Sequence, residues 1–247
     1  MRVLSLDTTT RAGSAALVAD DRVVDERRGD AARNHALRLP AELIALAAAH
    51  QWPLPEIDLY AVASGPGSFT GLRIGIATMQ GLALVNGRRM VAVSALDALA
   101  HAASGHLPDG AVIGAWMDAH RHEIFAGLYR VHEAKRFSRE RLTEIGEPSA
   151  GSPAATLARW QALIGGSPAV IAGDGAVLYA EEIARDAPGT RVAAPPDLAG
   201  AIGLLAVERA ADALEPSAVR PLYVRRPDVE ILRDEKLRQP AIQPKHT

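Results

Sequence analysis

The residues best suited to chemistry lie at the ends of two predicted strands. Asp7 closes the first apolar stretch and precedes three threonines, and residues 65–71 read Gly-Pro-Gly-Ser-Phe-Thr-Gly. A glycine turn that opens a helix can offer backbone N–H groups to an anion, and a carboxylate beside hydroxyls could hold Mg²⁺ and phosphate. The candidate residues of this phosphate-loop-like site are Asp7, Thr8, Thr10, Gly65, Gly67, Ser68 and Thr70.

The same residues have a structural explanation. A strand-end Asp commonly accepts hydrogen bonds from turn amides, and a glycine turn can simply lead into a closely packed helix. The glycine spacing differs from G-x-G-x-x-G, and no Lys-Ser/Thr pair follows Gly71, so the turn is neither a dinucleotide fingerprint nor a Walker loop. The residues by themselves leave both explanations open.

The helix after the turn carries Gly71, Gly75 and Gly81. Each interior glycine costs about 1 kcal/mol relative to alanine, or roughly 3 kcal/mol for the three together. Close packing against another helix or against a ligand must therefore offset this cost.

Other catalytic arrangements are poorly supported. The sequence contains no Cys, which excludes disulfides, a thiol nucleophile and a Cys metal site. It has no H-E-x-x-H and no G-x-S-x-G motif, so neither a zinc protease nor an α/β-hydrolase is indicated. His120 and His122, in a predicted hairpin, could form only a weak metal site, and His35 is either a helix-cap residue or a partner contact.

Composition indicates a globular protein without a dominant nucleic-acid surface. The 247 residues are 48% hydrophobic and 23% charged, with a formal net charge of −2. We read no signal peptide at the start, and no apolar run approaches the roughly 20 residues needed to span a bilayer. We therefore expect a cytoplasmic protein that does not contact a membrane.

The order of predicted elements repeats. Three strands within residues 3–27 precede a helix over 34–50, a strand over 59–63, a helix over 70–85, a strand over 90–93 and a short helix to Ala103. After a polar stretch the pattern restarts with strands over 112–117 and 123–130, and helices follow over 152–164, 176–187 and 198–214. We expect an α/β fold of two β-β-β-α-β-α subdomains, 1–104 and 105–226, with mixed sheets, helices on their faces, and a tail over 227–247.

Two such units, each with an Asp closing its first strand, resemble the actin-like (ribonuclease-H-like) ATPase and sugar-kinase superfamily. Residues 3–10, Val-Leu-Ser-Leu-Asp-Thr-Thr-Thr, and residues 63–75, Ala-Ser-Gly-Pro-Gly-Ser-Phe-Thr-Gly-Leu-Arg-Ile-Gly, closely resemble the bacterial TsaB (YeaZ) family. Residues 116–119, 125–129, 172–175 and 220–225 support the resemblance, which covers roughly residues 1–226.

The resemblance implies a non-catalytic scaffold subunit in the synthesis of threonylcarbamoyladenosine in tRNA. In that family the chain pairs with a catalytic TsaD-like subunit, which transfers threonylcarbamoyl to adenosine 37 of tRNAs reading ANN codons, and a TsaE-like ATPase joins the pair. We expect the chain to form a homodimer when it is alone, through an apolar face related by two-fold symmetry, and to reach tRNA through the complex.

The catalytic relative of this family binds metal through a His-x-x-x-His pair after the strand that follows the glycine-turn helix. Aligned on Val93, those positions here hold Ala95 and Leu99, neither of which can ligate a metal. We therefore expect no catalytic residues and no cofactor in the isolated chain, with ATP or ADP and metal only on partner subunits or at the interface of the complex.

The two helices that flank the glycine turn are more apolar than one buried face requires, and the resemblance makes them the docking surface for the catalytic subunit. The predicted interface residues are His35, Leu39, Leu43, Leu72, Arg73, Ile76, Ala77, Gln80, Gly81 and Leu84. Two alternatives remain at this stage, a stand-alone actin-like ATPase or kinase and, less favoured, an M22-type metallopeptidase.

Overall fold

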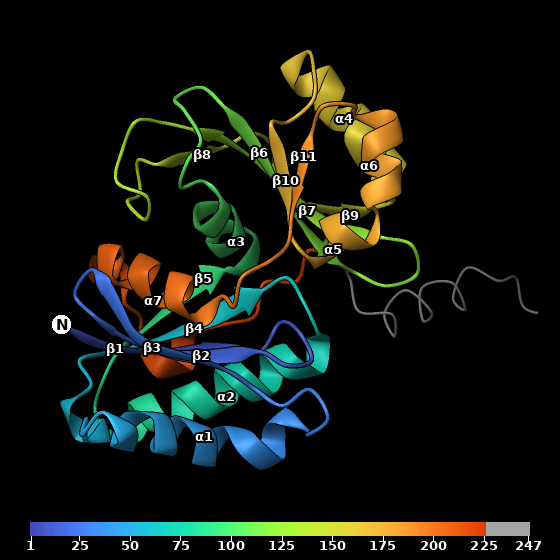
Figure 1. The fold of residues 1–247 in the computed structure, drawn as a ribbon. Helices are drawn as coiled ribbons and strands as arrows, with labels where there is room; N and C mark the ends of the chain where they lie inside the picture. Colours follow the sequence, from blue (N-terminus) through green and yellow to red (C-terminus); the bar gives the residue numbers. More distant parts are fainter. Residues whose placement is uncertain (226–247) are drawn as a thin grey trace, which may run out of the picture.

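Five strands form the N-terminal sheet of the computed structural model, which describes residues 1–225 (Figure 1). They are β1 (Arg2–Asp7), β2 (Ser14–Ala19), β3 (Arg22–Arg28), β4 (Leu59–Gly65) and β5 (Met90–Ser94), in the order β3-β2-β1-β4-β5. β1, β2 and β3 pair antiparallel, whereas β1, β4 and β5 pair in parallel. Since parallel strands end at the same edge of a sheet, Asp7 and the glycine turn after β4 lie next to each other.

The second sheet repeats this topology. Its strands are β6 (Val112–Asp118), β7 (Ile124–Val131), β8 (Leu142–Glu144), β9 (Ser149–Gly151), β10 (Val170–Ala172) and β11 (Arg191–Ala193). The order is β11-β10-β6-β7-β8, and β9 pairs with β7. In each sheet the first strand lies between its antiparallel second strand and a parallel strand, which is β4 in the first sheet and β10 in the second, so the predicted two-subdomain actin-like fold is confirmed. β9 was not predicted.

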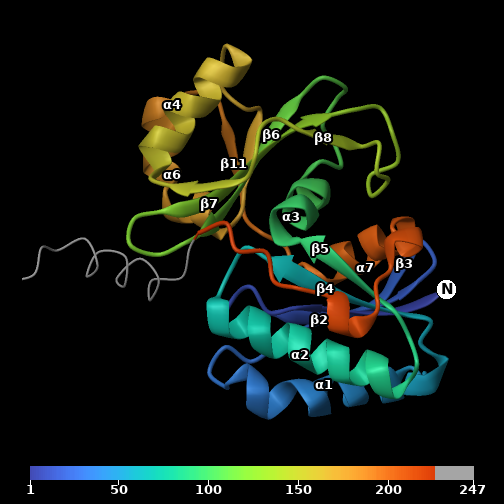
Figure 2. The same cartoon turned by 180° about the vertical axis from the view of Figure 1, so that it is seen from behind.

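Helices cover both faces of the N-terminal sheet. α1 (His35–Ala49) and α2 (Phe69–Val85) form an outer layer on one face, and α7 (Ala199–Glu208) lies on the other (Figures 1 and 2). Along β1, Leu4 and Leu6 join the core beneath α1 and α2, whereas Val3 joins the core beneath α7. α3 (Ala95–Ala103) lies between the two sheets, and α4 (Pro153–Ile164), α5 (Asp174–Leu178) and α6 (Ala180–Asp186) belong to the second subdomain.

Most helix starts follow the capping signals in the sequence. Asn34 caps α1, and serines cap α2, α3 and α4, at Ser68, Ser94 and Ser152. α1 continues through Pro40, its sixth residue, where the missing N–H leaves the Ala36 carbonyl without its usual helical donor. The helix predicted over 176–187 is two helices that meet at Tyr179, and the one predicted over 198–214 ends at Glu208.

α7 departs from the simple division of the chain at residue 104. It falls within 105–226, yet it packs on the N-terminal sheet, where the Ser5 hydroxyl donates to the Ala199 carbonyl at 2.7 Å and the Ala199 N–H donates to Ser14 Oγ at 3.0 Å. The second half of the chain thus contributes a layer to the first subdomain. The predicted tail, 227–247, lies outside the described residues. None of the helices in residues 1–225 has the length and apolar character needed to cross a membrane.

Candidate functional site

The glycine turn packs directly on the loop that follows β1. The Ser68 N–H donates to the Thr9 carbonyl at 2.8 Å, and a Cβ at Gly67, whose φ is +155°, would lie 2.5 Å from Thr9 Cβ. The Ser68 hydroxyl caps α2 by accepting from the Gly71 N–H at 3.2 Å. Two amides that an anion cradle would use, those of Ser68 and Gly71, are therefore already paired within the chain.

Asp7 serves the same loop. Its Oδ1 accepts from the Thr9 N–H at 2.8 Å and from the Thr9 hydroxyl at 2.7 Å, and its side chain is buried. Burial raises the pKa of Asp7, and the carboxylates of Asp197 and Asp174 raise it further. The strand-end carboxyl thus organises a turn, in a negative environment that disfavours an uncompensated phosphate.

The threonines and the helix glycines fill the remaining space. A Cβ at Gly71 would overlap the Thr8 carbonyl oxygen, and one at Gly75 would overlap the Thr8 hydroxyl, which is buried and has no hydrogen-bond partner. Thr10 accepts from the Gly13 N–H at 3.1 Å, while Thr70 is exposed in the first turn of α2. The structure therefore brings the phosphate-loop-like residues together, apart from Thr70, as a packed internal contact.

The corresponding edge of the second sheet has the same character. Asp118 Oδ1 accepts from the His120 N–H at 2.8 Å, and Asp174 Oδ1 accepts from the Asp118 N–H at 3.1 Å and the Gly175 N–H at 2.9 Å. Across residues 1–225, no three His, Asp or Glu side chains are grouped so that they could hold a metal ion. Both strand-end carboxylates thus bind turn amides.

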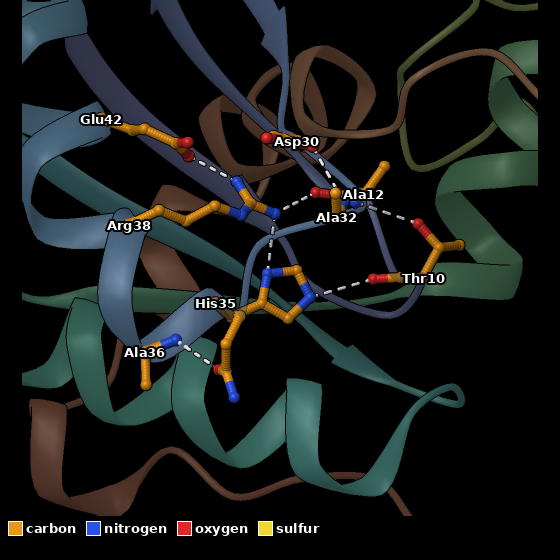
Figure 3. Close-up of polar contacts among 10 residues, drawn as sticks. Thr10, Ala12, Asp30, Ala32, His35, Ala36, Arg38 and Glu42 are labelled. Atoms are coloured by element: carbon orange, nitrogen blue, oxygen red, sulfur yellow. Dashed lines mark hydrogen bonds and ion pairs between the residues drawn. The ribbon is translucent and has the colours of Figure 1, made fainter.

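A buried polar cluster joins α1 to the loop after β1 (Figure 3). Arg38, which is 2% exposed, donates to the Ala12 carbonyl, to Glu42 and to His35 Nδ1. His35 Nε2 lies 3.1 Å from the Thr10 carbonyl. Because Nδ1 accepts from arginine, Nε2 carries the proton and the ring is neutral, in agreement with a pKa lowered by burial. His35 therefore fixes the loop from inside the chain.

Part of the predicted interface needs correction. His35 is bound within this cluster, and Leu39, Leu43, Leu72 and Ile76 are between 0% and 8% exposed together with it. These four apolar side chains pack inward beneath the outer helices and are not accessible to a partner. Likewise Gly71 and Gly75 pack against Thr8 of this chain, so the partner packing expected of them is replaced by an internal contact.

The residues that do face outward form a surface that we call the outer helix face. Leu37 and Ile44 of α1 are 78% and 50% exposed, and Leu84 and Val85 of α2 are 72% and 85% exposed. Between them the outward positions are small or cationic; they are Ala41, Ala45 and Ala48 of α1 and Arg73, Ala77 and Gly81 of α2. Exposed apolar side chains on two neighbouring helices are typical of an interaction surface.

The remaining predicted residue, Gln80, points elsewhere. Its Nε2 donates to the Pro216 carbonyl at 2.7 Å and the Val219 carbonyl at 3.1 Å, so it holds the segment that follows α7 against α2. Arg73 is also anchored to that segment, since its Nε donates to the Tyr223 hydroxyl at 2.9 Å and its guanidinium lies 4.0 Å from the centre of the Phe69 ring. Phe69 and Tyr223 stack with centroids 5.3 Å apart.

Sequence reasoning missed Leu37, Ile44 and Val85 as surface candidates. The helix over 34–50 was predicted, but its apolar stripe through Leu37, Ala41, Ile44 and Ala48 is the exposed one. The Phe69–Tyr223 contact joins residues distant in sequence and left no local signal.

Comparison with known proteins places this geometry in context. Residues 28–160, more than half of the chain, match the family model described as TsaD: tRNA N6-adenosine threonylcarbamoyltransferase. The protein is 33% identical over 130 residues to the tRNA threonylcarbamoyladenosine biosynthesis protein TsaB of Bacillus subtilis, covering 53% of this chain and 56% of that one. The chain thus spans little more than half of the length of this curated relative.

Two further proteins match over nearly all of the chain. An uncharacterized protein of Mycobacterium tuberculosis is 31% identical over 236 residues, which are 93% of this chain and 94% of that protein. The solved structure of YeaZ from Pseudomonas aeruginosa superposes with a TM-score of 0.68 at 28% identity, covering 90% of this chain and 99% of that one.

Proposed function

This chain belongs to the TsaB (YeaZ) family, and we propose that it takes part in the threonylcarbamoyl modification of tRNA as a non-catalytic scaffold subunit. Its role is to bind and support a TsaD-like catalytic subunit, which transfers the threonylcarbamoyl group to adenosine 37 of tRNAs that read ANN codons. The curated TsaB relatives and the match to the TsaD family model support this assignment.

The observation that carries the proposal is the contrast between the two candidate sites. The phosphate-loop-like turn is filled by hydrogen bonds and packing within the chain, whereas the outer helix face exposes Leu37, Leu84 and Val85 by 72% to 85%. A chain whose glycine turn is occupied by its own contacts, and whose outer helix face exposes apolar side chains, is better suited to binding a protein than to hydrolysing a nucleotide.

The outer helix face is the proposed docking surface for the TsaD-like subunit. Ala77 and Gly81 lie on the outward side of α2, and small residues let two helices approach closely, while the flanking leucines supply apolar area. In the absence of that subunit, the same face mediates a homodimer, because a two-fold axis pairs a patch with itself.

The other components follow from the same assignment. A TsaE-like ATPase joins the pair, and tRNA contacts this chain through the assembled complex. ATP or ADP and metal bind on the partner subunits or at their interface, and the chain works in the cytoplasm.

An arginine placed on the outer helix face tests the docking assignment. Ala77→Arg should abolish co-purification with the TsaD-like subunit, because the charge would be buried without a partner in a close contact. Ala158→Arg, the same change on the exposed side of α4, should leave binding intact. Thermal unfolding should show that both variants are folded. Survival of the complex with Ala77→Arg would refute the interface.

The non-catalytic assignment has a separate test. The chain alone, supplied with threonylcarbamoyl-adenylate and tRNA, should yield no modified nucleoside, and adding the TsaD-like and TsaE-like subunits should restore it. Product formation by the isolated chain would show that it is itself an enzyme. Tight one-site binding of ATP and Mg²⁺ in calorimetry would favour a stand-alone ATPase instead.

A further inference from the structure

One cation lies on the outer helix face without a counter-charge. The charged side chains of α1 and α2 are Arg38, Glu42 and Arg73, and the first two form a salt bridge with each other. Arg73 is exposed in the second turn of α2 and forms no salt bridge within residues 1–225. Along α2 it precedes Ala77 and Gly81 at four-residue spacing, so the three share one side of the helix. Arg73 therefore borders the small residues of the proposed docking surface.

Aromatic side chains hold Arg73 in place. Its guanidinium carbon lies 4.0 Å from the centre of the Phe69 ring and 5.9 Å from that of Tyr223, and its Nε donates to the Tyr223 hydroxyl at 2.9 Å. Tyr223 is itself fixed, because the preceding Leu222 N–H donates to the Ser64 carbonyl at 2.7 Å. Within the described chain the two Nη groups of Arg73 donate to no acceptor. They carry most of the N–H donors of the guanidinium.

The setting of Arg73 limits what can cover it. In the isolated chain the exposed guanidinium is hydrated, whereas an apolar surface placed over it would remove that water and return no hydrogen bond, which is strongly unfavourable. A protein that buries the outer helix face must therefore supply an acceptor at this point. A carboxylate suits it best, because its two oxygens accept from two parallel N–H groups of arginine. The aromatic contacts already order the side chain, so less entropy is lost when such a pair forms.

We infer that the subunit docked on the outer helix face places an Asp or Glu carboxylate against the Nη groups of Arg73, with Phe69 and Tyr223 as positioning residues. The inference rests on the proposed function and adds the chemistry that the partner presents. A nucleic acid fits this face less well, since phosphate binding uses several cations and Arg73 is the one exposed cation of α1 and α2.

A second copy of the chain also fits less well than such a partner. Its outer helix face would bring another Arg73, and the one carboxylate of its α1 and α2, Glu42, is already bound by Arg38. The homodimer through this face therefore lacks the charge pair that the complex with the TsaD-like subunit contains.

Calorimetry with the purified TsaD-like subunit tests the charge pair. Arg73→Gln should weaken binding at least about thirtyfold, because the partner's carboxylate is left buried and unpaired. Arg73→Lys should weaken it less, since lysine keeps the charge but not the planar fork. Tyr223→Phe, which loses only the hydroxyl, should weaken it about two- to tenfold. Arg191→Gln, the same change at an exposed position of β11, should bind within twofold of the wild type.

The homodimer separates a charge pair from damage to the surface. Sedimentation should show that Arg73→Gln dimerises at least as tightly as the wild type, because the substitution removes a cation from each copy and breaks no pair. Equal weakening of the homodimer and of the complex with the TsaD-like subunit would show that Arg73 acts through its shape, and the inference would be wrong.

Double-mutant cycles identify the carboxylate on the TsaD-like subunit. When its exposed Asp and Glu residues are replaced one at a time with Asn or Gln, one replacement should cost little further affinity in the presence of Arg73→Gln. Unchanged affinity of Arg73→Gln, or additivity in every cycle, would overturn this inference and leave the docking assignment standing. Failure of the wild-type chain to bind the subunit would overturn the proposed function as well. Loss of tRNA binding in Arg73→Gln, with unchanged affinity for the subunit, would assign Arg73 to RNA phosphate instead.

Discussion

Gly81→Ala should raise the stability of the isolated chain and weaken its binding to the TsaD-like subunit. Gly81 lies inside α2, and a Cβ built there meets no atom within 4 Å. Its two companions differ, because a methyl group at Gly71 or Gly75 would overlap Thr8. Gly81 is therefore the one glycine in this helix whose conformational cost is not offset by a contact within the described chain.

The expected gain in stability follows from helix propensity. Replacing a glycine with alanine in an exposed helix interior should raise the free energy of unfolding by about 1 kcal/mol. For a protein of this size that corresponds to an increase in melting temperature of about 2–4 °C. Gly75→Ala, the matched control, should instead destabilise, because Thr8 has to move.

Affinity should change in the opposite direction. If Gly81 lies in a close helix contact with the TsaD-like subunit, an added methyl group overpacks that contact at a cost of about 1–3 kcal/mol, which weakens binding about five- to 150-fold. Calorimetry with the purified subunit measures this. Unfolding should be followed at concentrations where sedimentation shows a monomer, since dimerisation would itself raise the melting temperature.

Two results would refute this reasoning. A lower melting temperature for Gly81→Ala would mean that the position is not open in the isolated chain. A higher melting temperature with unchanged affinity would mean that Gly81 lies outside the docking surface, and the close-packing explanation for this glycine would fail.

Two further predictions concern the loop after β1. Burial raises the pKa of Asp7 above its ordinary value of 3.8, so the folded state holds the proton more tightly, and stability falls as the pH rises from that value towards neutrality. Asp7→Asn keeps an oxygen that accepts from Thr9 and cannot ionise. Urea unfolding should therefore show that this variant is more stable than the wild type at neutral pH, and the difference should shrink in acid. Lower stability of the variant at neutral pH would contradict this prediction. Arg38→Met should lower the free energy of unfolding by about 1–3 kcal/mol for each buried acceptor left without a donor. Urea unfolding measures this, with Arg33→Met at an exposed position as the control. Equal stability of the two variants would show that the buried cluster does not stabilise the fold.

The elements that could be predicted are those specified locally. Helix starts at Asn34, Ser68, Ser94 and Ser152 follow from a side chain that accepts a nearby N–H, and the repeated strand order follows from alternating apolar stretches. The resemblance carried by residues 63–75 led to the family, which the comparisons then showed. These signals lie within a few residues of the feature that they predict.

The features that could not be predicted depend on contacts between distant residues. α1 has two apolar stripes, one through Leu37 and Ile44 and one through Leu39 and Leu43, and only the sheet beneath decides that the second is buried. The partner of Gly75 is Thr8, 67 positions earlier in the sequence. The return of α7 to the first sheet likewise depends on Ser5 and Ser14, far from it in the chain.

The loop after β1 connects these observations. It is held from one side by His35 and Arg38 of α1 and from the other by the glycines at the start of α2. The loop thereby fixes the two helices relative to each other. In the proposed complex that rigidity has a function, because a surface ordered before association loses less entropy on binding. The packed glycine turn thus orders the two helices, and their exposed apolar side chains supply the surface that binds the partner.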